Sequence, residues 1–82
     1  MKNYEKQAKL ILKTEMAKRD IDYPMLSNLL KEIGVNETRE NLANKINRGK
    51  FSFAFALQIL EVLQLNNLNL NNYNIHDDLT LY

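Results

Sequence analysis

The sequence predicts one small all-α domain of four or five helices over residues 1–65, followed by an Asn-rich C-terminal tail over residues 66–82. Apolar residues recur at the three- and four-residue spacing of helices as far as Leu63. The two glycines and the single proline lie at the borders of these apolar segments, where helices begin and end. A chain of 82 residues has room for one hydrophobic core only.

The composition excludes several classes of protein. The chain has no Cys, so it cannot have a disulfide framework. Its single histidine, His76, cannot form a His-rich zinc site alone. His76 precedes Asp77 and Asp78, but adjacent side chains point apart, so we expect no metal, cofactor or catalytic site there. So short a chain cannot readily enclose an enzyme-sized pocket, and we expect a protein that is not an enzyme.

Charge is distributed unevenly along the chain. Residues 1–50 hold eleven Lys and Arg against seven Asp and Glu, a surplus of +4, whereas residues 51–82 hold three acids and no Lys or Arg. This asymmetry favours an anionic partner at one face, although an ordinary solvated surface is the other interpretation. The N-terminal segment carries acids among its lysines and lacks the apolar run of a signal peptide, so we expect a cytoplasmic protein with no membrane partner.

The first helix is expected from Tyr4 onward. Its apolar residues are spaced by four, three, one and four positions and therefore gather on one side, toward the core: Tyr4, Ala8, Ile11, Leu12 and Met16. Lysines repeat at a similar spacing along a different side, where they form a basic ridge: Lys2, Lys6, Lys9 and Lys13. Such a ridge is either a solvated face or a contact for a phosphate backbone.

The second helix is expected within residues 21–35. Pro24 suits the first turn, and Gly34 can end the helix in a left-handed conformation. Either Asp22 or Tyr23 is the cap residue, because the carboxylate is the better acceptor whereas the position of Pro24 favours Tyr23. Four residues form the apolar face: Leu26, Leu29, Leu30 and Ile33.

The third helix is expected within residues 36–50, with Asn36 as the N-cap and Gly49 at the end. Leu42, Ala43 and Ile46 point toward the core, and the opposite side is almost wholly polar.

The fourth helix is expected within residues 53–65, capped by Ser52. Its apolar residues are dense enough to predict burial nearly all round: Phe55, Ile59, Leu60, Val62 and Leu63. Phe53 is displaced from the side shared by Phe51 and Phe55, and its exposure would indicate a protein contact.

The tail carries six Asn from position 66 onward. Four leucines alternate with polar residues in the period of a strand: Leu68, Leu70, Leu79 and Leu81. The tail is therefore expected to be extended and to add an edge strand to a second copy of the chain, which would give a homodimer. A short final helix after Asn74 and simple disorder are the other interpretations.

The second and third helices, joined by a turn that contains Gly, have the layout of a helix-turn-helix. The run from Ala43 to Ser52 resembles the end of the recognition helix and the following loop in lambda-repressor-like transcription regulators. The order of residue types matches that superfamily, in which an apolar residue, a polar or charged pair, Gly and a basic residue precede a helix capped by Ser. The matching residues are Ile46, Asn47, Arg48, Gly49, Lys50 and Ser52. The link from Val35 to Asn41 is longer than usual there, which leaves the tilt of the third helix open. Residues 7–63 also resemble a small bacterial family of uncharacterised domains.

The resemblance implies a sequence-specific binder of double-stranded DNA, a repressor-type transcriptional regulator acting as a two-fold dimer. It places five residues in the major groove: Arg39, Glu40, Asn41, Asn44 and Lys45. It places three nearest the phosphates: Arg48, Lys50 and Ser52. Asn can bond adenine, Arg or Lys can read guanine, and Glu can accept from cytosine.

The alternative function is a helix-turn-helix-shaped protein-interaction module, such as an adaptor or an antitoxin-like component, that does not bind DNA. Glu37 and Glu40 favour this alternative because carboxylates repel phosphates, and so does the net charge of only +1.

Overall fold

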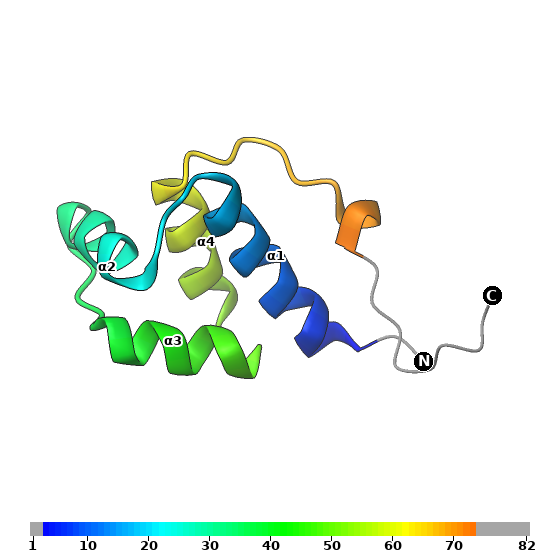
Figure 1. Ribbon diagram of the computed structural model, residues 1–82, viewed down its shortest axis with the longest axis horizontal. Helices are drawn as coiled ribbons and strands as arrows, with labels where there is room; N and C mark the ends of the chain where they lie inside the picture. The colour runs from blue at the N-terminus through cyan, green and yellow to red at the C-terminus, as the bar shows by residue number, and fades with distance from the viewer. Residues whose placement is uncertain (1–2, 74–82) are drawn as a thin grey trace.

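The computed structural model describes residues 3–73 and confirms the all-α prediction (Figure 1). Four α-helices follow one another, and residues 3–73 contain no strand: α1 (Tyr4–Lys18), α2 (Tyr23–Glu32), α3 (Arg39–Arg48) and α4 (Phe53–Val62). A short 3₁₀ helix, η1 (Leu70–Tyr73), lies in the tail. None of the described helices is both long enough and apolar enough to cross a membrane.

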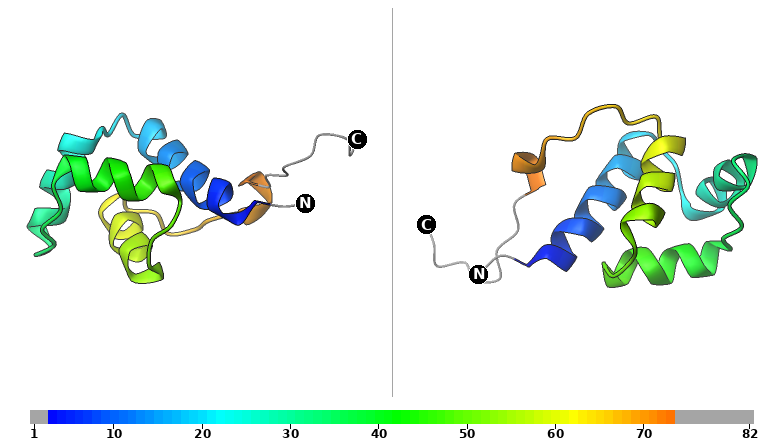
Figure 2. Two further views of the ribbon diagram at one scale, coloured as in Figure 1. Left: turned by 90° about the horizontal axis from the view of Figure 1, so that it is seen from below. Right: turned by 180° about the vertical axis from the view of Figure 1, so that it is seen from behind.

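One hydrophobic core joins the four α-helices. α1 contacts both α3 and α4, and α2 contacts the same two helices from the other end of the molecule (Figures 1 and 2). Ile46 of α3 and Ile59 of α4 are fully buried, as the apolar spacing predicts, and Leu60 is half-buried against the same cluster. The remaining fully buried side chains come from α1, α2 and α3: Leu12, Leu26, Leu30 and Leu42.

Polar side chains cap the helices by accepting hydrogen bonds from free backbone N–H groups in the first turn. Asp22 caps α2 through the N–H of Met25, at 2.9 Å, which decides between the two candidate caps. Ser52 caps α4 through the N–H of Phe55, as predicted. The prediction of Asn36 as the cap of the third helix is wrong, because Thr38 holds that position. The backbone is still extended at Thr38, and the Thr38 hydroxyl oxygen accepts a hydrogen bond from the N–H of Asn41.

Gly49 ends α3 in the left-handed conformation, with φ of 68°. Its backbone lies directly against the first turn of α1, so that a Cβ atom at this position would collide with the carbonyl group of Glu5. The glycine therefore serves both the turn and the close approach of α3 to α1.

Several apolar residues are more exposed than the spacing predicts. Tyr4 is 70% exposed, because the first turn of α1 extends past the core, and Ile33 is 40% exposed, because it caps α2 instead of lying within it. The prediction that the fourth helix is buried nearly all round is wrong as well. Phe53 is 76% exposed and Leu57 is 50% exposed, since no other helix covers the outer side of α4.

The described part of the tail returns to α1 instead of extending as a strand. After Leu65 the chain crosses the molecule and η1 packs against α1 (Figure 1). Tyr73 is buried, whereas Leu70 is exposed. No strand forms at Leu68 and Leu70, so this part of the strand prediction is wrong: Leu68 lies in an irregular segment, and Leu70 begins the 3₁₀ helix. Leu79, Leu81 and the possible helix after Asn74 lie outside the described residues, as do His76, Asp77 and Asp78.

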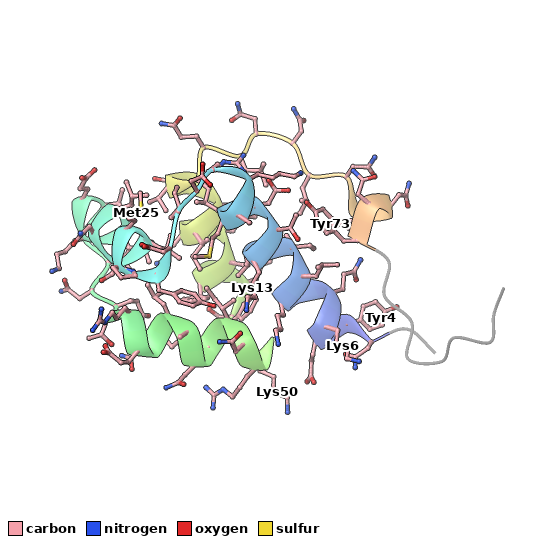
Figure 3. The ribbon with its side chains drawn as sticks, viewed as in Figure 1. Tyr4, Lys6, Lys13, Met25, Lys50 and Tyr73 are labelled. Atoms are coloured by element: carbon pink, nitrogen blue, oxygen red, sulfur yellow. The ribbon has the colours of Figure 1, made fainter. Side chains whose placement is uncertain are left out.

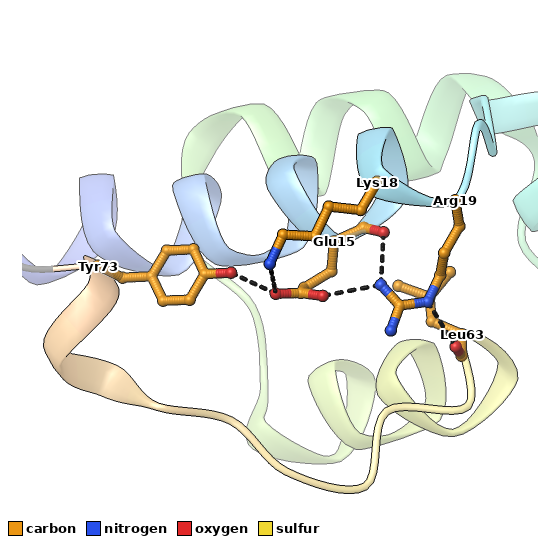
Figure 4. A network of polar contacts seen from close by, with 5 residues as sticks. All are labelled: Glu15, Lys18, Arg19, Leu63 and Tyr73. Carbon is orange, nitrogen blue, oxygen red and sulfur yellow. Dashed lines mark hydrogen bonds and ion pairs between the residues drawn. The ribbon is translucent and has the colours of Figure 1, made fainter.

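A buried carboxylate holds this turn in place (Figure 4). Glu15 is 4% exposed and accepts a hydrogen bond from the Tyr73 hydroxyl. Arg19 pairs with the same carboxylate at 2.7 Å and also donates to the carbonyl oxygen of Leu63, while Lys18 approaches the carboxylate at 3.3 Å. The Tyr73 hydrogen bond has the largest effect on the pKa of Glu15 and lowers it, and the two cations lower it further. Together they outweigh the burial of the carboxylate, which raises the pKa, so the pKa lies below its usual value of 4.5.

We expect Tyr73→Phe to lower the free energy of unfolding by about 1–2 kcal/mol, because a hydrogen bond to a buried carboxylate is lost. Since the folded state lowers the pKa of Glu15, its contribution to stability is present above pH 4.5 and is lost as the pH falls through the lowered pKa. The substitution should weaken this acid dependence. Urea titrations from neutral to acidic pH measure both effects, and a variant with unchanged stability and acid dependence would contradict the role of this bond.

Candidate functional site

The outer side of α3 carries a continuous polar surface, here called the α3 face: Asn41, Asn44, Asn47 and Arg48. All four residues are exposed, and with Lys45 they line an open hollow of about 390 Å³. The α3 face is turned away from the core because Leu42 and Ile46 occupy the opposite side of the helix.

Three side chains of the α3 face are available for a ligand. Asn41, Asn44 and Arg48 follow one another at spacings of three and four, so they form one row along the helix. Within residues 3–73, their side-chain polar atoms make no hydrogen bond or ion pair in the structure. An Asn amide offers both a donor and an acceptor, and Arg offers five donors, so the row can bind a partner with mixed hydrogen-bonding groups.

Lys45 is directed differently from this row. Its ammonium group forms an ion pair with Glu37 at 2.7 Å and lies 5.0 Å from the centre of the Phe55 ring. The Glu37 side chain is only 13% exposed, which makes this pair better shielded than a surface pair. The charge of Lys45 is therefore compensated within the protein.

Arg39 and Glu40 lie at the start of α3 and form an exposed ion pair at 3.3 Å. The Glu40 backbone N–H, and then Arg39, lower the pKa of the Glu40 carboxyl, so this group is ionised at neutral pH. Exposed pairs of this kind contribute little free energy, so either side chain can exchange its partner for a ligand group.

The three predicted phosphate-contact residues lie at the end of α3 and in the turn that follows it. Lys50 is well exposed just beyond the end of α3 (Figure 3). Its ammonium group lies 3.6 Å from the Glu5 carboxylate, which makes a loose pair across to α1. The Ser52 oxygen is occupied as the cap of α4, which leaves its O–H as a donor. Arg48 forms no ion pair among residues 3–73, unlike Lys50, and it is continuous with the row of asparagines.

Asn47 was not among the predicted contact residues, and its bond to α1 was not predicted either. Asn47 lies three residues after Asn44, which is sufficient to place it on the same side of the helix. Its side-chain oxygen accepts a hydrogen bond from Lys13 at 3.1 Å, which connects the α3 face with α1. The described residues contain no cluster of acids and histidines that could hold a metal ion.

The comparisons with known proteins give one result. Residues 4–68 match the model of a family described as a domain of unknown function (DUF6471), which covers all four α-helices. No curated protein and no solved structure shows a significant match to the chain. Since the matched region is well over half of the sequence, the chain belongs to the DUF6471 family.

Proposed function

We propose that this domain binds double-stranded DNA in a sequence-specific manner and acts as a transcriptional regulator of the repressor type. In this proposal α2 and α3 are a helix-turn-helix of the lambda-repressor-like kind, and α3 is the helix that enters the major groove. The observation that carries the proposal is the exposed row of Asn41, Asn44 and Arg48, whose polar atoms are unengaged among the described residues.

The chemistry of this row fits the edges of base pairs. An Asn amide can pair with N6 and N7 of adenine through two hydrogen bonds, and Arg39, at the start of α3, can do the same with O6 and N7 of guanine. We assign base contacts first to Asn41 and Asn44. Lys45, paired with Glu37, is the weakest of the predicted base contacts, because reading a base requires breaking a shielded ion pair.

Phosphate contacts are assigned to Lys50, Ser52 and Arg48, at the end of α3. The turn that they occupy is fixed by Gly49 against α1 and by the Ser52 cap, so the cations are presented from a rigid position. A two-fold dimer would set one α3 in each half of a symmetric site.

Asn44→Ala should weaken binding to a preferred site by about 1–3 kcal/mol and leave binding to random duplex nearly unchanged, because only the preferred site offers the matching base edge. Selection from a random duplex pool would provide the preferred site, and fluorescence titration of both duplexes measures the effect. Asn28→Ala is the matched control, since Asn28 is an exposed asparagine on α2 outside the α3 face.

Lys50→Ala should weaken both duplexes equally and lower the slope of log affinity against log salt by about one. A wild-type protein that binds no duplex at low salt would overturn the proposed function. So would equal losses for Asn44→Ala on preferred and random duplexes.

The alternative, a protein-interaction module without DNA binding, is supported by the outer side of α4. Phe53 is 76% exposed, and it borders an apolar hollow of about 310 Å³ between α1, α4 and the tail. Exposed aromatic residues beside apolar hollows are typical of protein contacts. If wild type fails to bind duplex, this surface becomes the site to test.

A further inference from the structure

Three lysines of the predicted basic ridge lie within the described residues and follow one another along α1: Lys6, Lys9 and Lys13. Spacings of three and four place them on one side of the helix, and with Leu10 they line an open hollow of about 450 Å³. Among residues 3–73, no carboxylate forms an ion pair with any of the three. From here the basic ridge denotes these three lysines.

The basic ridge is continuous with the α3 face. Lys13 reaches across to α3, where its ammonium group donates to the side-chain oxygen of Asn47 at 3.1 Å. The end of α3 meets the N-terminal half of α1 (Figure 2), and the side chain of Lys13 lies between the two helices (Figure 3). At the end of α3, Gly49 touches the backbone of Glu5. The two surfaces therefore border one another on a single side of the molecule.

The acidic residues near these surfaces are already paired with other cations. Glu5 pairs with Lys50, Glu37 with Lys45 and Glu40 with Arg39. The uncompensated charge on this side is consequently positive, and it comes from Arg48 together with the basic ridge. An anionic partner of some length is the ligand that complements it.

We propose that the basic ridge binds phosphates of the same duplex whose bases contact α3. This inference rests on the proposed function, and it adds a second contact surface on a different helix. Lys6 and Lys13 are seven residues apart, or about 10 Å along α1, and the phosphates of each strand recur about every 3.4 Å along the axis of a duplex. Lysine acts as a flexible point charge, so the contacts need no fixed geometry and carry no sequence information.

The arrangement also fixes how the duplex lies. With α3 in the major groove, the strand that borders it would run past the N-terminal half of α1. The basic ridge would then supply affinity on every sequence, while Asn41 and Asn44 supply the preference among sequences.

The test compares single charge removals on and off the ridge. Lys6→Gln, Lys9→Gln and Lys13→Gln should each weaken binding about fivefold at 0.1 M salt and lower the log–log salt slope by about 0.9. The triple variant should lower the slope by between about two and three and keep the wild-type preference between preferred and random duplex. Lys31→Gln is the matched control: it removes one exposed positive charge from the last turn of α2, away from the ridge.

The outcomes separate this inference from the proposed function. If wild type binds duplex with a clear preference but the triple variant keeps the wild-type salt slope, the ridge proposal is wrong and the proposed function stands. Equal losses for the ridge variants and Lys31→Gln would also overturn it, because they would show a general charge effect. If wild type binds no duplex at low salt, the proposed function fails and the ridge proposal fails with it.

Discussion

Ile46→Ala should lower the free energy of unfolding by about 2–4 kcal/mol. Ile46 is fully buried between α3 and the neighbouring helices, so the substitution removes buried methyl groups and leaves a cavity that the rigid backbone cannot close. A loss of this size is a large part of the stability of a small domain. Urea unfolding followed by circular dichroism measures it.

Leu57→Ala is the control for this substitution. Leu57 is 50% exposed on α4, so its truncation should change the free energy of unfolding by less than about 1 kcal/mol. A loss below about 0.5 kcal/mol for Ile46→Ala would place Ile46 on the surface and would contradict the position of α3 on the core.

Gly49→Ala should be about as damaging as the cavity at Ile46, with an expected loss of about 2–5 kcal/mol. Two costs add up: about 1–2 kcal/mol for a side chain in the left-handed region, and about 1–3 kcal/mol for forcing α3 away from α1. The second cost arises because the new Cβ atom would lie 2.8 Å from the carbonyl carbon of Glu5, and backbone cannot move aside as a flexible side chain does.

Gly34→Ala isolates the first cost. Gly34 also has a positive φ, of 82°, but no atom lies within 4 Å of the position that its Cβ would occupy. Its substitution should therefore cost only about 1–2 kcal/mol. Equal losses for the two alanine variants, measured by thermal and urea unfolding, would show that α3 does not depend on its close approach to α1.

Local sequence signals were sufficient for most of the helical architecture. The end of α3 at Gly49 was predictable because Gly is the residue best suited to the left-handed conformation. The cap of α4 was predictable because Ser52 directly precedes a long apolar run. The start of α3 was predicted less well. Asn36 and Thr38 are both good caps, and which one is used depends on how far the link from α2 extends before the helix begins.

The buried carboxylate could not be predicted from neighbouring residues. Glu15 falls among lysines, and a charged residue in a helix is ordinarily exposed. Its burial is possible only because Tyr73, 58 residues away, returns across the molecule to donate a hydrogen bond. No periodicity within α1 or within the tail carries that information.

For the candidate site, the side of α3 was predictable but the pairing of its charges was not. Helical spacing is sufficient to place Asn41, Asn44 and Arg48 together. The pairing of Lys45 depends on Glu37, which belongs to the link before α3, and on Phe55, which belongs to α4. The lysines of α1 gain their place beside α3 in the same way, through tertiary packing.

The distance along the chain between Glu15 and Tyr73 also bears on the order of folding. The four helices contact one another across shorter separations along the chain, whereas this hydrogen bond joins residues 58 positions apart. Among the described helices η1 contacts only α1, so we expect residues 66–73 to close after the four helices have assembled and to open before they melt. Each opening breaks the Tyr73 hydrogen bond that lowers the pKa of Glu15, so the segment should open more readily as the pH falls and the carboxylate takes up a proton.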